Sequence, residues 1–119
     1  MNNTEKRIIF IRWAAELTIF AKDQAIDFIV TCFKREDEEQ HRKFLAGLSQ
    51  IDGITERSNH QDWLAWDIAI IRHGVVTWNP DHGYKTLGAK WEESLGGYWG
   101  GKTILISGGK DYCHLGFDK

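Results

Sequence analysis

Residues 64–71 read LAWDIAII, a run of β-branched and aromatic residues that predicts a buried β-strand. Shortly after this run, Gly74 breaks the pattern, and the short segment 75–78, VVTW, predicts the return strand of a hairpin. Further upstream, residues 25–33, AIDFIVTCF, predict another buried strand of the same kind. We expect these segments to contribute to one sheet.

Helices are predicted on both sides of the upstream strand. The spacing of apolar residues predicts an amphipathic helix over Thr4–Asp23, with Thr4 as its cap. The densely charged run 34–43, with balanced signs, predicts a solvated helix that stops at Gly47. The apolar positions of the first helix are Phe10, Trp13, Ala14, Leu17, Phe20 and Ala21.

The rest of the chain alternates in the same way. A polar loop is predicted at residues 49–59, and a turn at 79–81 precedes a further amphipathic helix that ends at Gly96–Gly97. The glycine-rich tail predicts two final strands, at residues 103–106 and 112–117. Strands separated by helices but joined locally as hairpins give an α+β fold, with a mostly antiparallel sheet and two to three packed helices.

Length and composition bound the function. The 119 residues suit a single domain over 1–119, and the net charge of -2 carries no basic footprint for nucleic acid. The apolar stretch Ile8–Phe20 is interrupted by charges, so we expect neither membrane insertion nor a signal peptide. Cys32 and Cys113 form no CxxC motif, which favours two reduced thiols in a protein made in the cytoplasm.

Two pairs of residues could carry chemistry. His60 lies seven positions before Asp67, and Asp111 lies three positions before His114. The first pair can share one metal ion only if residues 61–64 fold back over the strand. Residues three apart on a regular strand face opposite sides, so the second pair needs a bend, which the nearby glycines favour.

Five motifs follow one another along the chain: Ser58-x-His60, Leu64-Ala65-x-Asp67, Leu87-Gly88-x-x-Trp91 with Leu95-Gly96, Trp99-Gly100-Gly101, and Asp111-x-x-His114. In order and spacing they resemble the small zinc peptidases of bacterial cell walls. These are the D-Ala-D-Ala carboxypeptidase and L-alanyl-D-glutamate endopeptidase group, which includes many phage endolysins and is related to the VanX dipeptidases. The resemblance runs from about Phe33 to His114 and implies a hedgehog/D-Ala-D-Ala peptidase-like fold with a zinc site at the sheet.

The resemblance implies that His60, Asp67 and His114 are the zinc ligands and that Asp111 is the catalytic carboxylate. Two neutral imidazoles and one carboxylate leave a fourth position of a zinc ion open for water, which is the arrangement of a catalytic site. Zinc lowers the pKa of that water and polarises the scissile carbonyl. Asp111 would take the proton of the water and pass it to the leaving amine.

Two positions depart from the family pattern. The family places an arginine in a Tyr-Arg-Thr-x-x-x-Gln run, and alignment on Gln40 selects Arg35 whereas alignment on Phe33 selects Lys34. Either cation would hold the developing oxyanion or a substrate carboxylate, and only arginine could hold the carboxylate in a bidentate way. Trp63 stands where the family usually has glycine, so it could reshape the substrate cleft or disable it.

The implied function is a monomeric zinc metallopeptidase, a peptidoglycan hydrolase that cuts stem peptides. The short loop 49–59 and the five residues after His114 leave little chain to close one end of a cleft, which favours an L-alanyl-D-glutamate endopeptidase. We expect a phage or prophage endolysin, made in the cytoplasm and acting on the cell wall after release. The alternatives are a D-Ala-D-Ala carboxypeptidase or dipeptidase and, in another class, a non-catalytic zinc-containing binding module, against which Asp111 argues.

Overall fold

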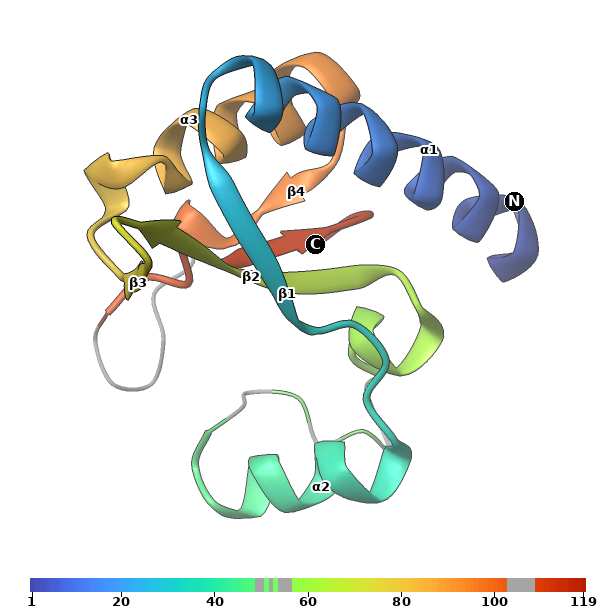
Figure 1. Cartoon of the computed structure of the whole chain (residues 1–119). Coiled ribbons are helices and arrows are strands. Elements are labelled where there is room, and N and C mark those ends of the chain that lie inside the picture. Colours follow the sequence, from blue (N-terminus) through green and yellow to red (C-terminus); the bar gives the residue numbers. More distant parts are fainter. Residues whose placement is uncertain (49–50, 52, 54–56, 103–108) are drawn as a thin grey trace.

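The structure is a computed structural model, and it describes residues 1–48, 51, 53, 57–102 and 109–119. Strand β2 (Ala65–Arg72) is the centre of the sheet, and β1 (Asp27–Cys32) pairs with one of its edges. The other edge of β2 pairs with β5 (His114–Gly116) at one end and with β3 (Val75–Thr77) at the other. A further strand, β4 (Tyr98–Trp99), extends the sheet beyond β5 (Figure 1). The described strands all pair in antiparallel fashion, and the predicted α+β fold class is confirmed.

Two helical segments cover one face of this sheet. They are α1 (Asn3–Asp23) and α3 (Tyr84–Ala89), which continues into a π-helical turn at Lys90–Leu95 (Figure 1). α1 begins one residue earlier than predicted, because the side chain of Asn2, and not of Thr4, accepts a hydrogen bond from the backbone N–H of Glu5.

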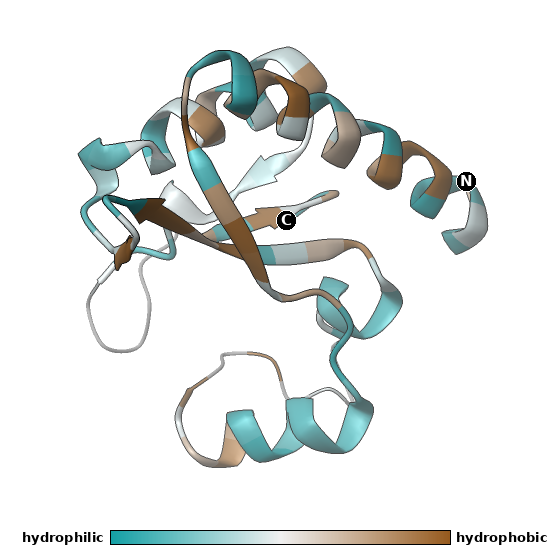
Figure 2. Cartoon of the chain, in the orientation of Figure 1, coloured by the Kyte–Doolittle hydropathy of each residue, from teal (hydrophilic) through white to brown (hydrophobic). Residues whose placement is uncertain are grey.

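The third helix, α2 (Asp37–Leu45), lies on the other side of the sheet in Figure 1. It is mostly hydrophilic, as predicted for a solvated helix, and the chain leaves it through Gly47 in a left-handed conformation, φ 74° (Figure 2). None of the described helices is long and apolar enough to cross a bilayer.

The hydrophobic core lies between α1, α3 and the face of β2 that carries Trp66, Ile68 and Ile70. Phe10 of α1 and Trp91 are 1% and 0% exposed, and their rings meet edge to face with centroids 5.4 Å apart. Because side chains alternate along a strand, the same packing turns Asp67 of β2 toward the opposite face of the sheet.

The last part of the chain differs most from the prediction. β4 has only two residues and was not expected, because its pairing with β5 and not its own sequence defines it. The final strand is His114–Gly116, shorter than the predicted 112–117, since residues 112 and 113 form a turn. The strand predicted at 103–106 lies outside the described residues.

Candidate metal centre

His60 reaches the sheet through a tight turn. It belongs to a 3-10 helix, Asn59–Asp62, which is closed at its start by a capping box between Ser58 and Gln61. Trp63 then adopts a left-handed conformation with φ 61°, and the N–H of Leu64 donates to the carbonyl of Asn59. The chain between His60 and Asp67 therefore folds back over the strand, as a shared metal ion would require.

His114 reaches the same place by strand pairing. Asp67 and His114 stand directly opposite each other in the antiparallel pair of β2 and β5, so their side chains project from the same face. His114 Nδ1 lies 3.3 Å from Asp67 Oδ1, and His60 Nε2 lies 3.3 Å from the same oxygen. The 3-10 turn, β2 and the distant strand β5 thus bring two imidazoles to one carboxylate.

The two nitrogen–oxygen separations around Asp67 suit a shared zinc ion. Two ligand atoms held about 2.1 Å from one tetrahedral cation are about 3.4 Å apart, close to the separations observed around Asp67. The rings of His60 and His114 are steeply inclined at 73°, so the two imidazoles do not stack on each other. The donor set, two imidazole nitrogens and a carboxylate oxygen, is one that zinc takes at catalytic sites. That these three residues bind zinc stays a prediction.

The electrostatics of the metal-free site are those of a charged cluster. Burial favours a neutral Asp67, but hydrogen bonds from His114 and His60 outweigh it and lower the pKa of the carboxyl. Burial also favours a neutral His60, but its hydrogen bonds with Asp67 and Cys32 raise the pKa of the imidazole to about 9. A proton on His60 therefore occupies the place that a metal cation would take.

Asp111 is held next to His114 by a tight turn. The backbone N–H of His114 donates to the carbonyl of Asp111 at 3.1 Å, and this turn supplies the bend that the sequence required. Gly100 makes the turn possible, because a Cβ atom there would lie 2.4 Å from the Asp111 carbonyl oxygen. Burial, together with the nearby charge of Asp67, raises the pKa of the half-buried Asp111 carboxyl.

The structure separates the two candidate cations. The Nζ atom of Lys34 donates to the carbonyl of Gln61, on the turn that carries His60. The guanidinium of Arg35 donates to Gln40 Oε1 at 2.6 Å and to Cys32 Sγ at 3.7 Å, and its Nε atom is buried without a hydrogen-bond partner. Arg35 therefore places positive charge beside a side chain that contacts His60.

Cys32 is the residue of this site that the sequence analysis missed. The donor atoms of Cys32, His60 and Asp67 all lie within 4.8 Å of one another. Its thiol contacts His60 Nδ1 at 3.7 Å, and this contact lowers the pKa of the thiol. No motif in the sequence marks the residue, because its position depends on how β1 pairs with β2.

Trp63, at the position where the resembling family usually has glycine, packs on an aromatic neighbour. It is 41% exposed and packs edge to face on Phe33, with ring centroids 5.2 Å apart. These two aromatic rings, Arg7 and Ile11 line a pocket between α1 and the turn of His60. None of the candidate ligands His60, Asp67 and His114 is among the described residues that line this pocket.

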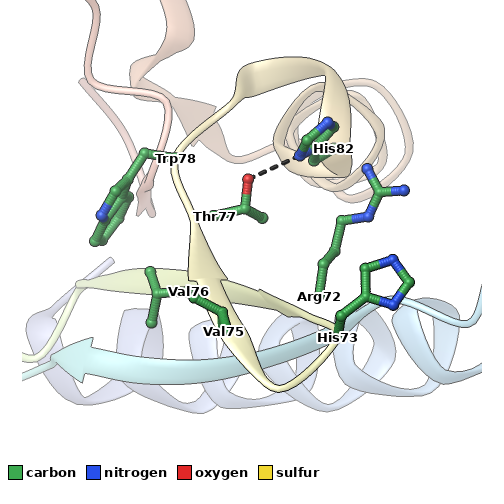
Figure 3. A pocket seen from close by; sticks show the side chains of 7 residues that line it. All are labelled: Arg72, His73, Val75, Val76, Thr77, Trp78 and His82. Carbon is green, nitrogen blue, oxygen red and sulfur yellow. Dashed lines mark hydrogen bonds between the residues drawn. The ribbon is translucent and has the colours of Figure 1, made fainter.

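A second pocket lies at the other end of β2. It lies at the β2–β3 hairpin. The pocket is lined by Arg72, His73, Val75, Val76, Thr77, Trp78 and His82 (Figure 3). Its two histidines are not brought together on a carboxylate: His82 Nδ1 pairs with the Thr77 hydroxyl at 2.8 Å, and His73 is exposed.

Comparison with solved structures adds evidence on the fold. No family model and no curated protein matches the sequence. Among solved structures, the chain is similar to the crystal structure of the Serratia marcescens L-Ala D-Glu endopeptidase ChiX, with a TM-score of 0.62 and 27% sequence identity. The match covers 77% of this chain and 67% of that one. The chain therefore shares its α+β fold with a solved L-Ala D-Glu endopeptidase.

Proposed function

We propose that this protein is a zinc-dependent peptidase that hydrolyses peptidoglycan stem peptides at the L-Ala–D-Glu bond. The observation that carries the proposal is the convergence of His60 and His114 on one oxygen of Asp67. The fold shared with an L-Ala D-Glu endopeptidase supports the reaction class and the bond. Because the substrate lies in the cell wall, we further propose a phage or prophage endolysin that is made in the cytoplasm and acts after release.

The metal would be held by His60, Asp67 and His114. Bound there, zinc acts as a Lewis acid that activates water and polarises the scissile carbonyl. The chain prepares His60 for this role, because the carbonyl of Phe33 can accept the Nδ1 proton at 3.1 Å. That tautomer leaves Nε2, the nitrogen nearer Asp67, unprotonated and available as a ligand.

Proton transfer is assigned to Asp111. Its carboxylate accepts the proton of the attacking water and then gives it to the leaving amine. The raised pKa of the buried carboxyl supports this role, because a group that both takes and gives a proton works best when its pKa approaches the working pH.

Arg35 is assigned to the negative charge of the substrate. Its guanidinium stands next to Cys32 in the site, whereas the ammonium of Lys34 is engaged with the carbonyl of Gln61. A cation fixed near the reacting carbonyl stabilises the oxyanion that develops during hydrolysis. Stem peptides also carry free carboxylates, which a planar guanidinium can bind through two hydrogen bonds.

The test is digestion of a purified disaccharide-tetrapeptide by the zinc-loaded protein, with the products identified by mass spectrometry. We expect L-Ala to stay on the sugar and a peptide that begins with D-Glu to be released. The matched control is Asp111→Asn, which should keep the fold and the zinc while the rate falls by about 10²-fold or more. Release of free D-Ala alone would indicate a carboxypeptidase, and no hydrolysis by the zinc-loaded chain would favour a non-catalytic module.

A further inference from the structure

A β-bulge near the end of β1 decides where the thiol of Cys32 points. From Asp27 to Val30, the residues of β1 pair in step with β2, the last pair being Val30 with Ile68. Without an irregularity Thr31 would stand opposite Asp67, but the register shifts by one and Cys32 takes that place. Directly opposed residues of an antiparallel pair project from the same face, so the bulge aims Cys32 at the face that carries Asp67.

The distances bring the thiol within reach of the metal site. The donor atoms of Cys32, His60 and Asp67 are all within 4.8 Å of one another. Sγ of Cys32 also contacts the imidazole of His60 at Nδ1, 3.7 Å away, whereas Nε2 is the ring nitrogen beside Asp67. A sulfur and a nitrogen or oxygen bound to one tetrahedral zinc ion are about 3.6 Å apart. A movement of about 1 Å by the cysteine side chain would therefore bring its sulfur to ligand distance.

We infer that Cys32 is a fourth protein ligand for the cation held by His60, Asp67 and His114. This inference rests on the metal site of the proposed function. Binding breaks the S–H bond and forms a sulfur–metal bond, and the thiol proton leaves to solvent. The guanidinium of Arg35, 3.7 Å from the sulfur, stabilises the thiolate before the metal arrives.

Four protein ligands would close the coordination shell of the metal. A structural zinc site is closed in this way, whereas hydrolysis needs one open position. The Cys32-ligated protein is therefore a resting form, and the sulfur must leave the metal before water and substrate can reach it. A soft sulfur ligand also favours zinc, cobalt and similar cations over magnesium or calcium.

Cobalt is the probe for this ligand set. The metal-free protein is loaded with one equivalent of Co2+, and the near-ultraviolet spectrum is searched for the charge-transfer band of a cobalt–thiolate bond. We expect the band in the parent protein, its loss in Cys32→Ser and its retention in the matched control Cys113→Ser. The thiol of Cys113 is also half-buried, but it donates to Asp111 Oδ1.

The outcomes separate this inference from the proposed function. Stoichiometric cobalt binding without a thiolate band, or a band that survives in Cys32→Ser, would overturn the role of Cys32 and leave the metal centre standing. Failure of the parent protein to bind cobalt or zinc would overturn both.

A measurement on the unmodified chain covers the case in which Cys32→Ser does not fold. Alkylation by iodoacetamide, followed site by site by mass spectrometry, should slow by about tenfold at Cys32 when zinc is added, because a metal-bound thiolate is a poorer nucleophile. The rate at Cys113 should not change. Equal rates at Cys32 with and without zinc would count against the inference.

Discussion

Two histidines lie near each end of strand β2, but only at one end do both imidazoles face the same carboxylate. At the Asp67 end, His60 and His114 face the same carboxylate oxygen, and His60 is only 3% exposed. At the hairpin end, His73 and His82 line an open pocket, and no carboxylate is among the described residues that line it (Figure 3). The comparison shows that a candidate metal site needs ligand atoms that face one another around a shared carboxylate. Two histidines near the same hairpin do not suffice.

The largest effect that this comparison predicts is on metal content. Zinc-loaded protein should hold about one equivalent, and His60→Ala should lose most of it, because removal of a buried imidazole ligand weakens zinc binding. His82→Ala, at the hairpin end, should keep the full equivalent. Metal analysis after dialysis measures both, with circular dichroism as the check of folding. Equal zinc contents in the two variants would show that the Asp67 end is not the metal site.

The next effect separates the two neighbouring cations. Arg35→Ala should lower the rate of stem-peptide hydrolysis by about 10²-fold, the scale of removing one group that stabilises an oxyanion. Lys34→Ala should lower it by less than about tenfold, because the ammonium of Lys34 donates to a backbone carbonyl on the turn of His60. Rates at saturating substrate, with zinc content measured in parallel, test this order. A larger loss in Lys34→Ala would assign the catalytic cation to Lys34.

The sequence predicted the parts of this site that local patterns determine. The run around Asp67 predicted the central strand, because apolar β-branched runs and turn residues act within a few positions. His60, Asp67 and His114 were implied as ligands by the family resemblance of the ordered motifs, and the structure brings the three side chains together. The position of Cys32 could not be predicted in this way. A shift of one residue in strand register reverses the face of every side chain beyond it, and the shift after Val30 exists only in the pairing of β1 with β2.

The affinity of the Asp67 end of β2 for zinc should depend on pH. In the metal-free chain the pKa of His60 is raised to about 9, so the imidazole is protonated at neutral pH and must lose its proton to bind zinc. The apparent zinc affinity should therefore rise by at least about tenfold per pH unit between pH 7 and 9. Calorimetry in buffers of different ionisation enthalpy should detect at least one released proton.

The same shift has a consequence for the metal-free fold. A pKa raised from 6.5 means that the pairing of His60 with Asp67 stabilises the fold fully below about pH 6.5, and that this contribution is lost as the pH rises through about 9. Thermal unfolding of the metal-free protein should show the decline, and His60→Ala should remove it.

The control for the zinc-affinity prediction is His82→Ala, which should leave the dependence of zinc affinity on pH unchanged. A zinc affinity that stays constant from pH 7 to 9 would contradict the charged state of His60.

The smallest effect is on the free energy of unfolding, and it concerns two residues with a left-handed backbone, one near each end of β2. Trp63 has φ 61° and His73 has φ 52°, and His73 forms a two-residue hairpin turn with Gly74, φ 77°. Both turn residues have positive φ, the pattern of a type I′ turn, which favours Asn-Gly. His73→Asn should therefore stabilise the fold by about 0.5 kcal/mol. His73 is exposed, and among the described residues it has no aromatic contact to lose.

At the Asp67 end of β2, replacing the left-handed Trp63 by glycine should not clearly increase the stability of the fold. Trp63→Gly removes a left-handed cost of about 1–2 kcal/mol. It also removes an edge-to-face contact with Phe33 that is worth about 0.5–1.5 kcal/mol beyond its buried area, and the buried area of the indole is lost as well, so the gain is offset. Urea unfolding of both variants measures the difference. If Trp63→Gly gains more than His73→Asn, the Phe33 contact does not offset the strain, and the turn that holds His60 is strained without compensation from its own aromatic pair.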